Sequence, residues 1–141
     1  MEARLFHECL DLILKPLKLA AQYGVLMADP LGTKRWCFTP LAAYIVDTPE
    51  SALISGVGGK TSSVTMVTFR QFGDDHRHPP RTASVTLEML QRLATIADPN
   101  DLENYVKEAL KCRLNGVHLP FWRDWPLSDP SIFLTSEPLH H

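Results

Sequence analysis

The 141-residue chain has a globular composition, with 45% hydrophobic and 21% charged residues and a formal net charge of −2. The length suits a single domain, and the composition excludes a disordered chain. The charge excludes a strongly basic protein, so composition by itself does not indicate nucleic-acid binding. Three cysteines, Cys9, Cys37 and Cys112, lack zinc-binding spacing, which indicates reduced thiols in an intracellular protein.

The N-terminal segment is predicted to be helical, because apolar residues recur at helical spacing over residues 3–22. Pro16 should kink or divide this helix, since proline lacks an N–H and clashes with the preceding turn. Gly24 should end it. With an acid at Glu2 and no long uncharged apolar run, the segment is predicted to be neither a signal peptide nor a membrane span.

Strands are predicted next along the chain. Residues 25–38 indicate two short strands around a turn. Residues 41–46, LAAYIV, form a continuous apolar run that is typical of a strand covered on both faces. A short helix is expected after Pro49. Residues 62–72 are rich in β-branched and aromatic side chains and predict another strand.

Two helices are predicted in the second half of the chain. The first covers about residues 84–97. The second should open with Asp98 as its N-cap and Pro99 at its first helical position. Asn115 and Gly116 should close it with a left-handed cap.

Asp47 and Glu50 stand three residues apart where a predicted strand meets a predicted helix, and they permit two interpretations. In the structural one they form a capping box, in which Asp47 accepts the N–H of Glu50 and the Glu50 side chain reaches back. In the functional one Asp47 is a metal-binding carboxylate at the carboxyl end of a strand, where α/β sheets place their ligands. Both can hold at once.

The end of the chain, LTSEPLHH, predicts the start of a new helix capped by Thr135 or Ser136. In that helix Glu137 would be a first-turn glutamate that favours the helix dipole. The aromatic segment before it, with Phe121, Trp122 and Trp125, permits base stacking, but we predict that it fastens a proline-stiffened tail onto the core.

Two further patterns lead to simpler interpretations. The run DDHRH at residues 74–78 has metal-ligand residue types, but it precedes two prolines and lacks a completing zinc set, so we predict a solvated loop. The run GVGGKTSSV contains Gly-Lys-Thr, yet Ile54 stands where a Walker loop needs its first glycine. That excludes a phosphate-binding loop.

From His7 to His141 the chain resembles the Plavaka-type transposases of fungi, relatives of the CACTA cut-and-paste transposases. Three segments carry the resemblance most specifically: LAAYIVDTPE at residues 41–50, LPFWRDWP at 119–126 and LTSEPLHH at 134–141. The resemblance implies an α/β fold with a partial RNase H-like core and a DDE set of carboxylates. It implies that Asp47, in the D-x-P-E motif, and Glu137 are catalytic and bind metal.

The same resemblance implies a function and its partners. We expect two Mg²⁺ or Mn²⁺ ions for phosphoryl transfer on DNA, transposon-end DNA as the partner, and a nuclear or intracellular location. No small-molecule substrate is expected. The chain is then a single partial catalytic domain, 1–141, with three parts. Residues 1–60 contain the first helix and the strands that end in D-x-P-E. Residues 61–117 contain a strand and a helical insertion, and residues 118–141 are the aromatic tail that leads to the last catalytic helix.

The chain departs from the family pattern in two places. Many relatives carry a C-P-x-C knuckle after the D-x-P-E segment, whereas this chain reads GKTSSV there, so a structural zinc at that place is not expected. The first catalytic aspartate of the family lies upstream of the first helix. We therefore expect an interior fragment that is inactive alone and prone to self-association, unless Asp29 or Asp124 substitutes for the missing acid. The alternative is a non-catalytic transposon-derived remnant that acts as a protein-interaction module.

Overall fold

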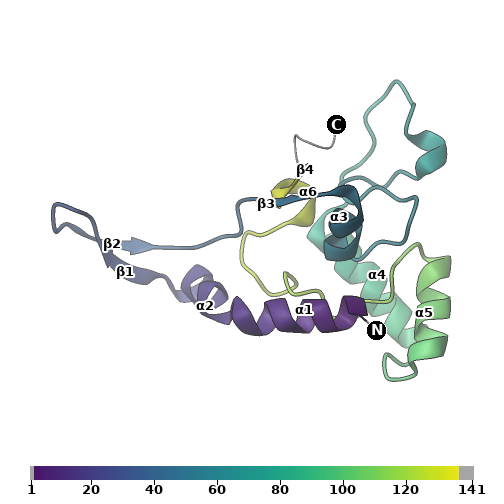
Figure 1. Ribbon diagram of the computed structural model, residues 1–141, viewed down its shortest axis with the longest axis horizontal. Coiled ribbons are helices and arrows are strands. Elements are labelled where there is room, and N and C mark those ends of the chain that lie inside the picture. The colour runs from purple at the N-terminus through teal and green to yellow at the C-terminus, as the bar shows by residue number, and fades with distance from the viewer. Residues whose placement is uncertain (1, 137–141) are drawn as a thin grey trace.

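The computed structural model describes residues 2–136 and confirms a mixed α/β chain (Figure 1). None of the helices in this range is both long and apolar enough to cross a membrane. In chain order the elements are α1 (Glu2–Ile13), α2 (Lys15–Tyr23), β1 (Val25–Ala28), β2 (Lys34–Cys37), β3 (Tyr44–Val46), α3 (Thr48–Ser55), the 3₁₀ helix η1 (Phe69–Gln71), α4 (Ala83–Ile96), α5 (Leu102–Lys111), α6 (Pro130–Phe133) and β4 (Leu134–Ser136).

The first helix divides at the predicted place. Leu14 separates α1 from α2, and Pro16 lies in the first turn of α2, where its missing N–H costs no helical hydrogen bond. Gly24 ends α2 with a φ of 73° and donates its N–H to the carbonyl of Ala20. A β-carbon at Gly24 would approach the Phe38 ring to 3.2 Å, so a side chain there would disturb the approach to the hairpin.

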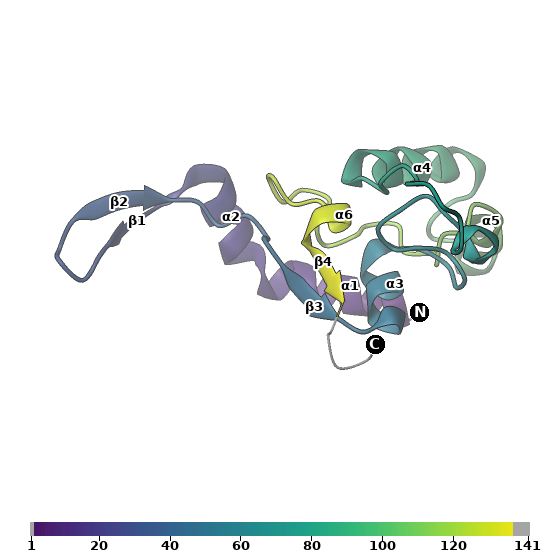
Figure 2. The same ribbon diagram turned by 90° about the horizontal axis from the view of Figure 1, so that it is seen from above.

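The predicted hairpin is present and projects away from the rest of the chain (Figures 1 and 2). Strands β1 and β2 pair antiparallel, with Leu26 opposite Trp36. Asp29 closes the turn by accepting the N–H groups of Leu31 and Thr33. Because the ribbon lies beyond the body, the large apolar side chains of both strands stay exposed, including Trp36 at 66%.

Strands β3 and β4 form a parallel pair, which Figure 2 shows side by side. The register aligns Tyr44 with Leu134 and Val46 with Ser136. The prediction of a strand over residues 41–46 that is covered on both faces is wrong, because the strand begins only at Tyr44 and Ile45 is 67% exposed. Residue 135 lies in β4 and does not act as a helix cap; the helix predicted after it lies outside the described residues.

The predicted strand at residues 62–72 is also wrong: all of these residues are described, and none lies in a named strand. Local bonds replace a ladder here. Ser62 donates its N–H to the Val67 carbonyl, and its hydroxyl accepts the N–H of Thr65. Gln71 closes a capping box with Thr68 around η1. Polar side chains of this kind compete with strand pairing by bonding their own backbone.

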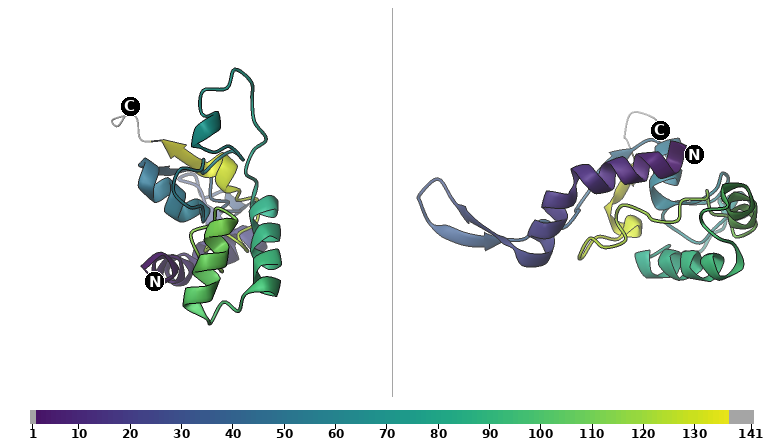
Figure 3. Two further views of the ribbon diagram at one scale, coloured as in Figure 1. Left: turned by 90° about the vertical axis from the view of Figure 1, so that its right-hand side faces the viewer. Right: turned by 90° about the horizontal axis from the view of Figure 1, so that it is seen from below.

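Helices α4 and α5 lie side by side at one end of the molecule (Figure 3). Helix α4 matches its predicted range, with Thr82 accepting the N–H of Val85. The start of α5 was predicted wrongly: Asp101 is the N-cap, whereas Asp98 accepts the N–H of Asn100 in a preceding turn. A short Asx turn satisfies Asp98 locally and delays the helix by three residues.

The C-terminal cap of α5 was also predicted wrongly. Arg113 takes the left-handed conformation, with a φ of 62°, and the Leu114 N–H reaches the Ala109 carbonyl. That pattern is a Schellman motif, which ends the helix at Lys111 rather than at the predicted Asn115 and Gly116.

The aromatic tail is fastened to the core, as predicted. Phe121, Trp122 and Trp125 are at most 5% exposed, and they pack with Ile54 and Phe133. Burial of each large apolar side chain contributes about 1.5–3 kcal/mol. The ring nitrogens are also satisfied, because Trp122 Nε1 donates to the Ile54 carbonyl at 2.7 Å and Trp125 Nε1 donates to the Thr39 carbonyl at 2.9 Å.

His7 joins three segments at the buried carboxyl end of α3. Its Nδ1 accepts the N–H of Phe121 at 3.1 Å, so the ring proton lies on Nε2, which donates to the Leu53 carbonyl at 3.0 Å. Asn115 donates to the same carbonyl. Burial lowers the pKa of His7, and its neutral form is the one that can accept the Phe121 N–H.

The lowered pKa of His7 predicts a pH-dependent stability. The unfolded chain takes up a proton on this histidine near its ordinary pKa, while the folded chain does not, so the free energy of unfolding should fall as pH drops from 7 to 5.5. The loss is at most about 1.3 kcal/mol per histidine. Urea unfolding at both pH values measures it.

Among the described residues His118 also has a lowered pKa, caused mainly by burial, so it supplies a companion variant for this prediction. The variants His7→Gln and His118→Gln should each flatten the pH dependence, and the double variant should remove most of it. A His7→Gln chain that loses as much stability as the wild type over this pH interval would contradict the assignment.

Candidate functional site

Asp47 lies at the carboxyl end of β3 and caps α3. Its Oδ1 accepts the N–H of Glu50 at 2.8 Å, which confirms the first half of the predicted capping box. The second half is wrong. The Glu50 side chain turns to Tyr44 instead, and its Oε1 accepts a hydrogen bond from the Tyr44 hydroxyl at 3.2 Å. Burial and, secondarily, the Glu50 carboxylate raise the pKa of Tyr44, so this phenol remains a donor.

A small cavity of about 100 Å³ lies beside Asp47. Its walls come from the end of β3, the start of α3, the following loop and β4. Ser51 donates from α3 to Ser63 across one side at 2.6 Å. The volume suits an ion or a few water molecules and is too small for an organic ligand. Its lining residues are Val46, Asp47, Thr48, Ser51, Ser63, Val64, Leu134 and Thr135.

The other predicted site residue, Glu137, lies outside the described residues. The structure does define the strand that leads to it. Ser136 is the last residue of β4 and pairs with Val46, and Asp47 follows Val46 directly.

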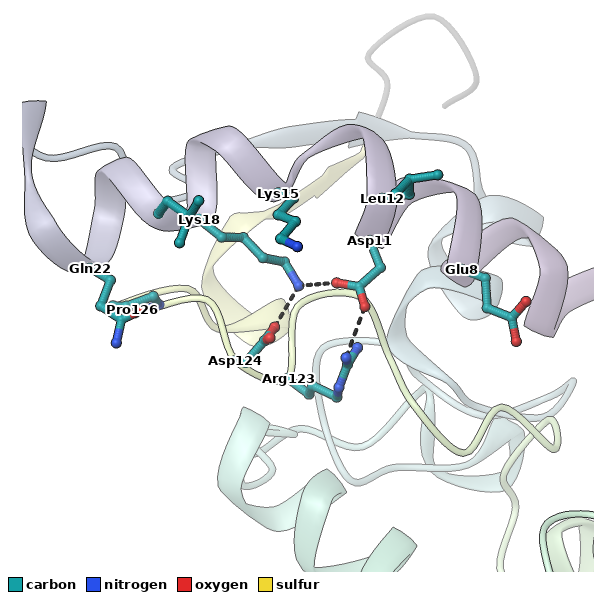
Figure 4. Close-up of a pocket in the computed structure, with 10 residues that line it drawn as sticks. Glu8, Asp11, Leu12, Lys15, Lys18, Gln22, Arg123, Asp124 and Pro126 are labelled. Carbon is teal, nitrogen blue, oxygen red and sulfur yellow. Dashed lines mark hydrogen bonds and ion pairs between the residues drawn. The ribbon is translucent and has the colours of Figure 1, made fainter.

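A second group of charges holds the tail on the N-terminal helices (Figure 4). Lys18, whose side chain is only 8% exposed, makes ion pairs with Asp11 and Asp124, and Arg123 binds the other oxygen of Asp11 at 2.8 Å. Partial burial acts to raise the pKa of Asp11, but the hydrogen bonds from Lys18 and Arg123 outweigh it and lower the pKa. The two contacts that reach the tail, Lys18 with Asp124 and Arg123 with Asp11, each join residues more than 100 positions apart, and they were not predicted.

The same geometry gives other roles to the two acids considered as substitutes for a missing catalytic aspartate. Asp124 is ion-paired with Lys18. Asp29 holds the turn of the projecting hairpin and contacts Arg35 at 3.4 Å. Neither lines the cavity beside Asp47.

Arg81 is a buried cation that sequence reasoning missed. It is 2% exposed, and its Nε donates to the Ser62 carbonyl at 3.1 Å. One terminal nitrogen is buried without a partner among the described residues. Burial lowers the pKa of this guanidinium. An arginine after two prolines reads as a loop residue, so local sequence held no signal of its burial.

The loop at residues 74–78 is largely exposed, as predicted, but it also brings potential metal ligands together. One ligand atom from each of Asp74, His76 and His78 lies within 4.8 Å of the others. The signal in the sequence was the alternation of Asp74, His76 and His78 within DDHRH, which supplies three potential ligands and not the four of a closed zinc site.

The cap at Asp47 predicts a stability difference between two substitutions. Asp47→Ala removes the acceptor of the Glu50 N–H and should cost about 1 kcal/mol, whereas Asp47→Asn should cost little, because Asn caps nearly as well. Urea unfolding of both variants measures the difference. If the Asn variant is as unstable as the Ala variant, the carboxylate charge rather than the cap stabilises the chain.

The comparisons with known proteins give one match. The model of the Plavaka transposase family matches residues 1–141, which is the whole chain. None of the curated proteins and none of the solved structures matches it. Because the family match covers every residue, including the D-x-P-E segment that carries Asp47, the chain belongs to the Plavaka transposase family.

Proposed function

We propose that this chain forms part of the catalytic core of a DNA transposase, in which Asp47 and Glu137 bind divalent metal ions for phosphoryl transfer. Membership of the transposase family supports the general function. The observation that carries the assignment is the parallel pairing of β3 with β4, which sets the positions preceding both carboxylates opposite each other.

The pairing bears directly on the distance between the two acids. Ligands of α/β sheets gather at the carboxyl ends of parallel strands. Asp47 follows the paired residue Val46, and Glu137 is covalently attached to the paired residue Ser136. Each acid is thus one peptide unit, about 3.8 Å between Cα atoms, beyond a residue of the pair.

The donors around Asp47 fit a hard divalent cation such as Mg²⁺ or Mn²⁺, which prefers carboxylate oxygens and water. The Glu50 N–H holds Oδ1 in one orientation, and Asp47 borders the small cavity between β3 and β4. When bound, a pair of such ions activates the attacking oxygen and stabilises the leaving one. The chain's own contribution is to orient the carboxylate and to shape the cavity.

A partial RNase H-like core belongs to this proposal, as do transposon-end DNA as the partner and a nuclear location. The formal charge of −2 means that DNA contacts must come from local groups of basic residues.

A second candidate function, protein interaction, is favoured by the hairpin. Leu26, Met27 and Trp36 are each more than half exposed on a ribbon that projects from the body (Figure 1). Unpaired strand edges with apolar side chains favour association with another chain. We propose that this hairpin mediates self-association, which is compatible with the catalytic role.

The catalytic proposal predicts a metal-binding defect without a folding defect. Substoichiometric Mn²⁺ should broaden the amide NMR signals of Val46, Asp47 and Ser51 in the wild-type chain. Asp47→Asn keeps the cap, yet it should weaken Mn²⁺ binding by about tenfold or more, because even indirect partners of metal ligands contribute on this scale.

The matched control for this experiment is Glu50→Gln, which keeps the backbone N–H that Asp47 accepts and lies one helical turn away. It should retain Mn²⁺ binding. Equal broadening in the Asp47→Asn chain and the wild type would leave Asp47 with the capping role alone.

The hairpin predicts a concentration-dependent association. Replacing the cross-strand pair Leu26 and Trp36 with serine should weaken self-association by about tenfold or more, since it removes two large apolar contacts. Sedimentation velocity over a range of concentrations measures this. Leu110→Ser, which removes a comparably exposed leucine from α5, is the control and should leave association unchanged. A wild-type chain that stays monomeric throughout would refute the proposal.

A further inference from the structure

We propose that Asp74, His76 and His78 form a binding site for Zn²⁺, separate from the carboxylate site at Asp47. One ligand atom from each residue lies within 4.8 Å of the others. The rings of His76 and His78 have centroids 4.5 Å apart, and His78 Nε2 lies 2.9 Å from Asp74 Oδ2. This proposal does not rest on the proposed catalytic function.

The residue types suit zinc. Imidazole nitrogen and carboxylate oxygen bind Zn²⁺ at about 2.0–2.2 Å, so ligand atoms around one ion lie roughly 3.3 Å apart. The spacing in the structure exceeds this by at most about 1.5 Å, which side-chain rotation can remove. His76 has the freedom to do so, because its side chain is 64% exposed. Mg²⁺, which prefers oxygen ligands only, should not compete.

The backbone that carries the three ligands is fixed at both ends. Before it, the Asp74 N–H donates to the Gln71 carbonyl at the end of η1. After it, the Pro79 carbonyl accepts the N–H of Met66 at 3.0 Å, and the Arg81 N–H donates to the Val64 carbonyl. A ligand loop held in this way loses less conformational entropy when an ion binds.

A neighbouring carboxylate adds a second feature of metal-binding histidines. Asp75 Oδ1 lies 3.5 Å from His76 Nδ1, which is too long for a good hydrogen bond; a small rotation of the exposed His76 ring would close this distance and leave Nε2 as the metal ligand. Ligating histidines commonly donate their other ring N–H to a carboxylate.

Three protein ligands leave one tetrahedral position open. The ligands border an open hollow of about 480 Å³, with Val64 and Phe72 among its other residues, which leaves room for a water molecule as the fourth ligand.

Zinc titration of the full chain, expressed without a histidine tag, tests this site by calorimetry. The wild type should bind one ion per chain. The double variant His76→Ala, His78→Ala should bind about 30-fold more weakly or not at all, within the range that loss of metal-site partners produces. The matched control, His140→Ala with His141→Ala, removes the same number of histidines and should stay within about twofold of the wild type.

Two further measurements separate a site from a folding effect or an adventitious thiol. Asp74→Asn keeps the size of the side chain and should also weaken binding, with an unchanged far-ultraviolet circular dichroism spectrum. Bound Co²⁺ should give visible bands without a thiolate charge-transfer band, and Cys9→Ser should not alter them. Wild-type affinity in the His76 and His78 double variant, equal losses in both double variants, or binding that disappears with Cys9 would overturn the proposal.

Discussion

The architecture depends on how the carboxyl end of α3 is satisfied. The last carbonyls of a helix lack intrahelical partners, and in a buried end each unpaired group would cost about 1–3 kcal/mol. Here Leu53 accepts from His7 and Asn115, and Ile54 accepts from Trp122. Three distant segments are therefore drawn onto one helix end. Because Asp47 caps the other end of the same short helix, these contacts also fix the candidate site.

The ion pairs around Lys18 reinforce this arrangement from the other side. Lys18 has its side chain largely buried between two carboxylates, and Arg123 shares one of them (Figure 4). Only Lys18 is largely buried, since the Asp124 side chain is 58% exposed, and loss of a carboxylate would leave the buried Lys18 charge with less compensation. The network therefore acts mainly to specify where the tail crosses α1 and α2, while the aromatic side chains of the tail supply the apolar burial.

The body and the hairpin differ in how their side chains are covered. The core around α3, the tail and β4 is closely packed, whereas both strands of the hairpin expose their apolar side chains. A two-stranded ribbon is only marginally stable by itself in water. The contrast supports an interaction role for the hairpin and a positioning role for the core, in a chain whose family acts as transposases.

The sequence by itself determined the features that depend on neighbouring residues. These are the division at Pro16, the hairpin, helix α4 and the cap that Asp47 gives to α3, because each follows from backbone chemistry within a few positions. Only the tertiary structure decided the burial of His7 and Arg81, since their partners lie 19 to more than 100 residues away.

The short range of local sequence signals also explains which predictions were wrong and how much of the candidate site could be predicted. Residues 62–72 have strand composition, but their backbone groups bond partly within their own turns and partly to residues 79–81 by isolated contacts, and no long partner strand runs beside them in the described structure. Asp47 was predictable as a strand-end carboxylate, whereas the pairing of β3 with β4 joins segments about 90 residues apart and had no local signal. Asp47 could therefore be identified from the local sequence, whereas only the tertiary structure shows that β4 lies beside β3.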